Sequence, residues 1–229
     1  MAARKKTVSA RRGSVGRIYE QLKRRAITFE FRPGDRLNEG AIARQLGVSR
    51  TPLREALNRL TVDGLLTFFP NQGFFRKPLE AKEIFDLWEF RLVIESGAAR
   101  LAVQRASTEA IEEIHRFLDE SGEDHPERTI EELVAIDEGF HERLMAMTGN
   151  AEMLRSLQHI NARIHYVRID VNARVDAPQK HAQHRAILQA LKERDSQRCE
   201  ALLRQHIEQR FDQIIDAVRR CYARIYVPA

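Results

Sequence analysis

The chain has 229 residues, of which 43% are hydrophobic, and a formal net charge of +5, so it is long enough for two modest domains with separate cores. Residues 1–78 hold 17 basic and 6 acidic side chains, whereas the remainder holds 21 basic and 27 acidic ones, which indicates one module for a polyanion and another for a different partner. No apolar run could span a bilayer and the basic N-terminus lacks the apolar segment of a secretory signal, so we expect a cytoplasmic protein with no membrane partner.

The first predicted elements are an N-terminal arm and a helix. Residues 1–13 are basic and show no periodicity, so we expect a disordered basic arm that could add contacts to phosphates. From residue 14 the apolar positions recur at helical spacing and predict a helix that ends near Thr28. These positions are Val15, Ile18, Leu22 and Ile27. The stretch Phe-Arg-Pro-Gly-Asp at 31–35 then predicts a turn.

Residues 41–66 predict two short helices joined by a tight turn and followed by a strand. The first helix has an apolar stripe and stops at Gly47. Ser49 then occupies an N-cap position, and Pro52 falls in the first turn of the second helix, where its missing N–H is not needed. The second helix has its own apolar stripe, which should face a core and consists of Leu53, Ala56, Leu57 and Leu60.

The opposite side of the second helix carries hydrogen-bond donors, among them Arg50, Thr51 and Arg54. In a helix–turn–helix, a polar second helix of this kind enters the major groove of DNA with its N-terminal end first. An arginine fork matches O6 and N7 of guanine, so we expect Arg50 and Arg54 to contact base edges and Thr51 to contact a base or a phosphate. We count Ser49, at the same end, among the DNA-binding residues. The alternative is an ordinary helical hairpin with a solvated basic face.

A β-hairpin is predicted next, with strands at 65–69 and 74–77 joined by a turn at 70–73. Beside a helix–turn–helix, such a hairpin is a wing. Gly73 would let its tip approach a phosphate or the minor groove closely, and Asn71 offers a donor there; the alternative is that the turn alone requires Gly73. Three further basic residues are expected to hold phosphates, namely Arg36, Arg44 and Lys77.

The rest of the chain, residues 79–229, is expected to form an all-helical domain, because the pattern from residue 80 onward is helical to the end. The predicted helices run roughly over 80–105, 108–121, 127–148, 150–171, 178–193 and 195–222. Amphipathic helices of this length form a bundle whose interior can hold a small molecule. The predicted fold is therefore mainly α, with a winged helix–turn–helix domain over residues 14–78 followed by a helical bundle.

A candidate metal site lies in the predicted bundle. Asp137 and His141 are four residues apart and project from the same face of one helix, while His184 and His206 lie on two later helices. One carboxylate and three imidazoles pointing inward would bind a divalent transition metal such as zinc or nickel. Each histidine alone is more often an ordinary polar or core residue, and His181 competes with His184 for the role of ligand.

The order of these features resembles the GntR family of bacterial transcription regulators. The resemblance rests on Val-Ser-Arg-Thr-Pro-Leu-Arg-Glu-Ala-Leu at 48–57, on Asn-Gln-Gly at 71–73, and on the helical half, which is similar to the FCD ligand-binding domain of the FadR-like subfamily. It covers residues 14–220. It implies a homodimer that reads an inverted repeat in operator DNA and whose second domain binds an effector and dimerises. One departure is Gly40, where the family usually has a charged or polar residue, often an arginine that contacts DNA, so that contact should be missing.

The same resemblance bears on the ligand site. Metal-binding members with an FCD domain carry an Asp-x-x-x-His followed by two later histidines. That pattern is matched here by Asp137, His141, His184 and His206. The family's Arg-x-x-x-Glu corresponds to Arg91 and Glu95, and both are counted as effector-binding candidates. The resemblance implies that the arginine clamps an effector carboxylate near the metal; the alternative is an i,i+4 ion pair on a helix surface. Arg163 is a second candidate for effector binding. A metal beside an arginine favours a small organic acid as the effector.

The expected function is transcriptional regulation, most simply repression, in which a small carboxylate bound at the metal site controls operator affinity. Effector binding would change the packing of the bundle and so the spacing of the two DNA-binding heads. One alternative is a metal-dependent hydrolase, because such a metal can activate water, but no nucleophile or positioned general base accompanies it. Another is an architectural DNA-binding protein, which would leave the polar set in the bundle unexplained. We therefore expect no enzymatic activity.

Overall fold

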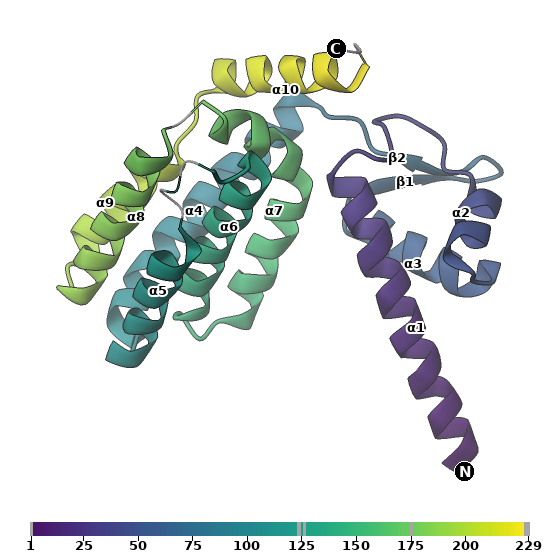
Figure 1. Ribbon diagram of the computed structural model, residues 1–229, viewed down its shortest axis with the longest axis horizontal. Helices are drawn as coiled ribbons and strands as arrows, with labels where there is room; N and C mark the ends of the chain where they lie inside the picture. Colours follow the sequence, from purple (N-terminus) through teal and green to yellow (C-terminus); the bar gives the residue numbers. More distant parts are fainter. Residues whose placement is uncertain (1, 123–124, 126, 175, 227–229) are drawn as a thin grey trace. The chain divides into compact units, whose positions relative to one another are not determined.

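The computed structural model describes residues 2–122, 125, 127–174 and 176–226, and the chain divides into two compact units, Met1–Leu79 and Glu80–Ala229 (Figure 1). Each unit has hydrophobic side chains packed in its own interior. No helix among the described residues combines the length and the apolar character that crossing a bilayer requires.

The first unit consists of helices and a two-stranded hairpin. Its elements are α1 (Ala2–Ile27), α2 (Glu39–Leu46), α3 (Arg50–Val62), β1 (Leu66–Phe69) and β2 (Gly73–Arg76). α1 includes residues 2–13, so the structure has helix where we expected a disordered basic arm. Alanine, lysine and arginine, which are good helix formers, dominate residues 2–13, and the segment contains no proline. The helix over residues 14–27 can therefore extend toward the N-terminus through it.

The turn between α2 and α3 has the chemistry that the sequence predicted. Gly47 adopts a left-handed conformation with φ 62°, and its N–H donates to the carbonyl of Arg44 at 3.2 Å. Asn38 caps the start of α2 by accepting from the N–H of Ala41 at 3.0 Å. Ser49 occupies the N-cap position of α3 with an extended backbone, but its side chain makes no capping hydrogen bond. Its hydroxyl is therefore left at the exposed N-terminal end of α3.

α1 and α3 pack against each other to form the core of this unit. Leu22 of α1 and Leu53, Leu57 and Leu60 of α3 have no exposed surface. Phe74 of β2 is equally buried in the same cluster. Because the apolar side of α3 is held inward by this core, its polar side faces away from the unit.

β1 and β2 pair antiparallel, from Leu66 opposite Arg76 to Phe69 opposite Gly73, within one residue of the predicted strands. In the turn between them Asn71 has φ 62° and Gly73 has φ 95°. A side chain at position 73 would strain the backbone at that angle. The turn itself therefore accounts for Gly73, whatever the tip of the hairpin contacts.

Arg76, at the end of β2, is buried and ties three segments together. Its Nε donates to the carbonyl of Ala26 at 3.1 Å, and its Nη1 donates to the carbonyls of Leu65 at 2.8 Å and Lys77 at 3.0 Å. The guanidinium also lies over the ring of Phe29, 4.5 Å from its centre. One side chain thus joins the end of α1 to the residues that flank the two ends of the hairpin.

Replacing Arg76 with methionine is expected to lower the free energy of unfolding by about 1–3 kcal/mol, because three carbonyls lose a donor that methionine cannot replace. Urea denaturation followed by circular dichroism would measure the loss. Arg36→Met, which changes an exposed arginine of the same unit, is the control and should change stability little. Equal stability of the two variants would contradict this role of Arg76.

The second unit is a helical bundle. Its elements are α4 (Ala81–Arg105), α5 (Thr108–Ser121), α6 (Ile130–Ala146), α7 (Ala151–Asn172), α8 (Ala177–Lys192), α9 (Ser196–Ile207) and α10 (Phe211–Tyr226). α4 packs against α6, α7, α8, α9 and α10, so it is the central helix of the bundle (Figure 1). The predicted helices between residues 80 and 193 correspond to α4 to α8.

One prediction for this unit is wrong, because residues 195–222 form two helices and not one. α9 ends at Ile207, whose carbonyl accepts a hydrogen bond from the indole N–H of Trp88 at 2.8 Å. Glu208 then leaves the helical conformation, with φ −57° and ψ 129°. At the start of α10 the side chain of Gln213 accepts from the N–H of Arg210 at 2.8 Å. The residues at this break include no proline or glycine. The last carbonyl of α9 is instead held by the hydrogen bond from Trp88 on α4, which is distant in the sequence.

Candidate functional site

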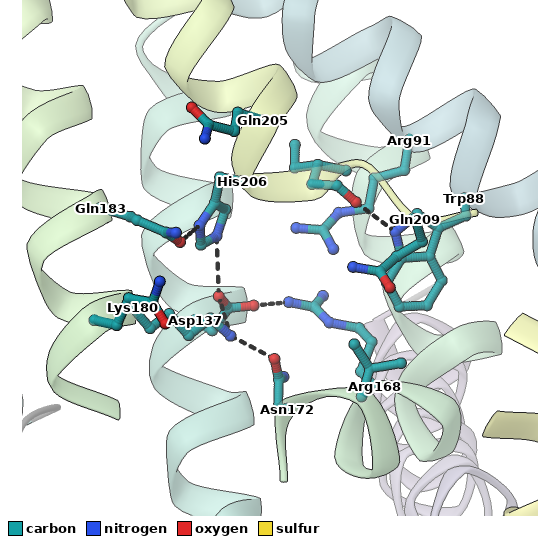
Figure 2. A pocket seen from close by; sticks show the side chains of 13 residues that line it. Trp88, Arg91, Asp137, Arg168, Asn172, Lys180, Gln183, Gln205, His206 and Gln209 are labelled. Carbon is teal, nitrogen blue, oxygen red and sulfur yellow. Dashed lines mark hydrogen bonds and ion pairs between the residues drawn. The ribbon is translucent and has the colours of Figure 1, made fainter. Parts of the chain in front are cut away.

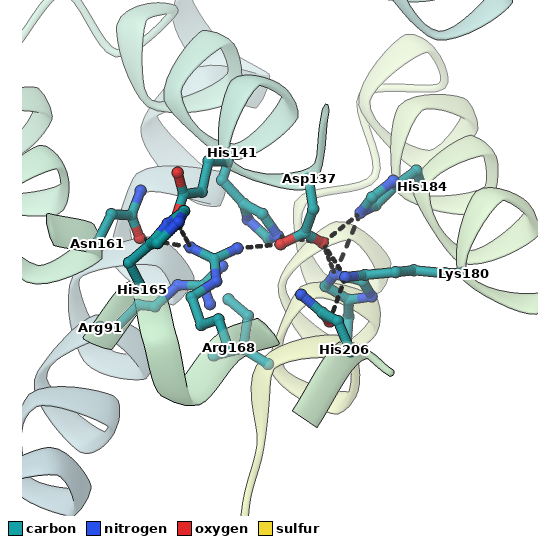
Figure 3. Close-up of polar contacts among 12 residues, drawn as sticks. Arg91, Asp137, His141, Asn161, His165, Arg168, Lys180, His184 and His206 are labelled. Carbon is teal, nitrogen blue, oxygen red and sulfur yellow. Dashed lines mark hydrogen bonds and ion pairs between the residues drawn. The ribbon is translucent and has the colours of Figure 1, made fainter. Parts of the chain in front are cut away.

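Four side chains that can bind a metal meet inside the second unit. Asp137 and His141 come from successive turns of α6, His184 from α8 and His206 from α9 (Figure 3). Their ligand atoms all lie within 4.8 Å of one another. Asp137 Oδ1 is 3.3 Å from Nε2 of His184, 3.5 Å from Nε2 of His206 and 3.8 Å from Nε2 of His141. With metal–ligand bonds of about 2.1 Å, neighbouring donors lie about 3.0–3.4 Å apart, so the set is close to the spacing of a coordination shell.

Hydrogen bonds on the outer nitrogens of two rings direct their inner nitrogens toward Asp137. Nδ1 of His141 lies 2.5 Å from Oε2 of Glu95 on α4. Nδ1 of His206 lies 2.8 Å from Oε1 of Gln183 on α8. Partners of this kind fix the tautomer and the orientation of a ligating imidazole. Glu95 and Gln183 therefore engage the outer nitrogen of each ring, so that Nε2 is turned toward the other members of the set, as in the 3.2 Å contact between Nε2 of His206 and Nε2 of His184.

The histidines of the set are suited to be neutral ligands. Burial, which disfavours the charged form, lowers the pKa of His141 to about 4 and lowers that of His206 well below its usual value. The ring of His184 is fully buried and stacks on Phe140, with centroids 4.1 Å apart. A neutral imidazole is the form that binds a metal.

The donor set fits a divalent transition metal. Nε2 of His141 is buried and has no hydrogen-bond partner, so its lone pair is available at the centre of the set. Three imidazole nitrogens and one carboxylate oxygen suit zinc or nickel. His181 is not part of the set: its Nε2 accepts a hydrogen bond from Nε of Arg185 at 2.9 Å. The structure thus brings the four predicted residues together and separates His184 from its competitor.

Asp137 also contacts two buried cations. Arg168 of α7 donates to Oδ2, and Nζ of Lys180 on α8 lies 2.6 Å from Oδ1. Burial alone would raise the pKa of Asp137, but the charges of Lys180 and Arg168 hold it well below its usual value. The carboxylate is therefore ionised, and it is shared between the histidine set and two positive side chains.

A pocket of about 240 Å³ opens beside this set. Figure 2 shows the guanidinium groups of Arg91 and Arg168 pointing into it from α4 and α7. Nη2 of Arg91 is buried and has no hydrogen-bond partner. Burial and the nearby charge of Arg168 lower the pKa of Arg91. An anion bound in the pocket would offset the repulsion between these two guanidinium groups. The pocket is therefore suited to a small anion.

The other two predicted effector-binding residues are placed differently. Glu95 is buried beside Arg91, with one oxygen 2.5 Å from Nε of Arg91 and the other against His141. Burial alone would raise its pKa, but Arg91 and His141 outweigh burial and lower it to about 2. The Arg91–Glu95 pair is thus an i,i+4 ion pair, although a buried one. Arg163 pairs with Glu83 of α4 and is not among the residues that line the pocket.

Arg168 and Lys180 were not predicted from the sequence. Arg168 lies between the buried residues Val167 and Ile169, so a charge within an apolar segment was a readable signal. Lys180 lies four residues before His184 and therefore on the same face of α8. Neither signal is specific, because many lysines and arginines at such positions extend their charged ends to solvent.

The polar face of α3 is exposed in the first unit. Arg50, Thr51 and Arg54 are all exposed near its N-terminal end. Nε of Arg54 lies 3.6 Å from Oε2 of Glu39 on α2, and its guanidinium is 5.8 Å from the centre of the Phe74 ring. These contacts restrain Arg54 while about half of its side chain stays accessible, at 51%.

The remaining predicted DNA-binding residues also reach the surface. Arg36, Arg44 and Asn71 are exposed, and Gly73 and Lys77 are partly exposed. At Gly40 an added Cβ would lie 3.9 Å from Nη1 of Arg44. The guanidinium of Arg44 therefore lies close to the position that a side chain at residue 40 would take.

Known proteins similar to this chain share its two-part organisation. Residues 15–75 match the domain described as bacterial regulatory proteins, gntR family, and residues 86–209 match the FCD domain. The Nta operon transcriptional regulator of Aminobacter aminovorans is 44% identical over 88% of this chain and 94% of its own length. The HTH-type transcriptional repressor GlaR of Escherichia coli (strain K12) is 25% identical over 82% of this chain and 90% of its own. The structure of E. coli McbR/YncC has the same fold, with a TM-score of 0.74, 21% identity and coverage of 91% of this chain and 98% of that one.

Proposed function

This chain belongs to the GntR family of bacterial regulatory proteins, in the FadR-like group with an FCD domain, and we propose that it is a repressor whose operator affinity is set by a small organic acid bound beside a metal ion. As a member of this family it is a DNA-binding transcriptional regulator and not an enzyme, which excludes the hydrolase alternative. The name of GlaR, a repressor related to this chain, supports repression.

On the DNA side, we assign α3 to the major groove. Arg50 and Arg54 are exposed at its N-terminal end and would donate to guanine, with Thr51 beside them on a base or a phosphate. The residues that we assign to the phosphates or the sugar–phosphate backbone of the DNA are Arg36, Arg44, Ser49, Asn71, Gly73 and Lys77. The operator would be an inverted repeat read by two copies of the chain.

A second copy of this chain is the partner that we propose for one face of α4. Phe90 and Val93 are 50% and 66% exposed, and three residues apart on a helix they lie on the same side. Gly97 continues this side one turn further and has open space where a Cβ would be. Exposed apolar side chains next to a small residue suit close packing against an identical helix.

On the ligand side, Asp137, His141, His184 and His206 would hold a divalent transition metal, with Glu95 positioning His141. When bound, the metal would supply Lewis-acid attraction for a carboxylate oxygen. The orphaned Nη2 of Arg91 at the pocket carries this part of the proposal, because a buried N–H group without an acceptor is costly unless a ligand accepts its hydrogen bond.

The charge balance favours an acidic ligand. Three cations and three carboxylates lie buried or nearly so around the pocket and cancel, namely Arg91, Arg168, Lys180, Glu95, Asp137 and Glu138. A divalent ion would therefore leave an excess of two positive charges among these largely buried side chains. An organic acid with one or two carboxylates would offset that excess.

A fluorescence anisotropy titration of labelled promoter DNA from beside the protein's own gene tests the proposal. With Zn²⁺ or Ni²⁺ present, we expect one acid from a panel of mono-, di- and tricarboxylates to change operator affinity by about 5- to 150-fold. Arg91→Met should bind the operator normally and lose that response, whereas Arg163→Met should keep it. The proposal is wrong if neither the acids nor removal of metal by a chelator changes operator affinity.

A further inference from the structure

One oxygen atom is shared by the metal-ligand set and a lysine. Oδ1 of Asp137 faces Nε2 of three imidazoles at 3.3–3.8 Å, and the same atom lies 2.6 Å from Nζ of Lys180 (Figure 3). The other oxygen, Oδ2, accepts from the buried guanidinium of Arg168. Oδ1 is thus the oxygen that faces the three imidazoles, so an ion held by the four residues would bind the atom that Lys180 contacts.

We propose that Lys180 is an internal competitor of the metal, whose ammonium neutralises Asp137 when no ion is bound and withdraws from Oδ1 when one binds. This inference rests on the metal site of the proposed function. An ammonium and a divalent ion on one buried oxygen would repel each other strongly, because little solvent screens charges there. Lys180 itself is only 8% exposed, so its charge is not dispersed into water.

A second acceptor already exists for the displaced ammonium. Besides its ion pair with Asp137, Nζ of Lys180 donates a hydrogen bond to Oδ1 of Asn172 at 2.6 Å. Lys180 and Asn172 both line the pocket into which Arg91 and Arg168 point (Figure 2). Withdrawal from Asp137 would therefore keep the ammonium at the pocket, where it becomes available to an anion.

Two properties follow from this arrangement. The metal-free protein should stay folded, because the ammonium of Lys180 compensates the charge of Asp137 when no ion is bound. In a closed structural zinc site, by contrast, the ligands lose their only partner when the metal is removed. In addition, metal binding provides the pocket with a lysine that Asp137 no longer holds, so metal and acid should bind cooperatively. Lys180 would thus couple the two ligands of the regulator.

The test measures the affinity of the purified full-length protein for Ni²⁺ by competition with a chromophoric chelator. Lys180→Met keeps the length of the side chain and removes its charge, and we expect it to bind Ni²⁺ about 10- to 100-fold more tightly than the unchanged protein. Lys192→Met, which replaces an exposed lysine of the same helix, is the matched control and should not change the affinity. Lys180→Gln, which keeps a polar end without a charge, serves if the methionine variant does not fold.

The outcomes separate this inference from the metal site itself. His184→Ala should lose Ni²⁺ binding, and if it binds as tightly as the unchanged protein, the proposed metal site is wrong. If His184→Ala loses binding but Lys180→Met and Lys180→Gln bind Ni²⁺ equally or more weakly than the unchanged protein, then Lys180 supports the ligand and does not compete. Tighter binding by the Lys180 variants, with no change for Lys192→Met, supports competition.

Discussion

Replacement of Asp137 by alanine is expected to lower the free energy of unfolding by about 3–5 kcal/mol, because it removes the carboxylate that two buried cations share. Arg168 donates to one oxygen of this carboxylate and Lys180 lies 2.6 Å from the other. The same change removes the only oxygen ligand of the proposed metal site, so we expect metal binding to be lost as well. Urea denaturation with and without added Zn²⁺ would measure both effects.

The matched control is Asp119→Ala, which breaks an ion pair with Arg185 at the surface of the same unit. The side chain of Asp119 is 55% exposed, and pairs of that kind contribute little to stability. We therefore expect a much smaller loss, and Zn²⁺ should still stabilise this variant. If the Asp119 and Asp137 variants were equally stable, Asp137 would not be the centre of a buried charge network.

The second large effect is expected at the DNA-binding face. Replacing Arg50 and Arg54 together with alanine should weaken operator binding by about 2–6 kcal/mol, since an arginine that reads a guanine contributes about 1–3 kcal/mol of discrimination. That loss corresponds to roughly 30-fold or more in affinity. Both side chains are exposed, so circular dichroism and thermal unfolding should be unchanged.

The comparison with random DNA decides what these arginines do. If they read bases, the double variant loses much more affinity for the operator than for random DNA at the same salt concentration. Arg44→Ala, assigned to a phosphate, should instead lose affinity for both by a similar factor. A double variant with equal losses on the two DNAs would demote Arg50 and Arg54 to phosphate contacts.

The parts of the fold that local sequence encodes were predicted closely. The apolar stripe of α3, the glycine at its preceding turn and the hairpin after it are local patterns, and the structure has all three. The split between α9 and α10 was missed because its cause lies far away, in the hydrogen bond from Trp88 to the carbonyl of Ile207. A tertiary contact of this kind leaves no mark in the residues at the break.

The candidate site shows the same division. The spacing of Asp137 and His141 predicts two candidate ligands on one helix face, and the family pattern, which His184 and His206 also match, supports the full set of four. The side chains that orient and neutralise these candidate ligands come from other helices. Glu95, for example, contacts His141 although the two residues are 46 positions apart in the sequence, so no local pattern connects them. The family pattern predicts Glu95 as an effector contact, whereas in the structure both of its oxygens face protein groups.

The most direct measurement is X-ray diffraction at the absorption edges of zinc and nickel, on crystals of protein purified without chelator and supplied with both metals. We expect an anomalous peak bonded to Asp137, His141, His184 and His206, with Nζ of Lys180 moved away from Oδ1 of Asp137. Density for an anion should appear against Arg91 when the effective acid is included. The absence of any anomalous peak among these four side chains would contradict the proposed metal site.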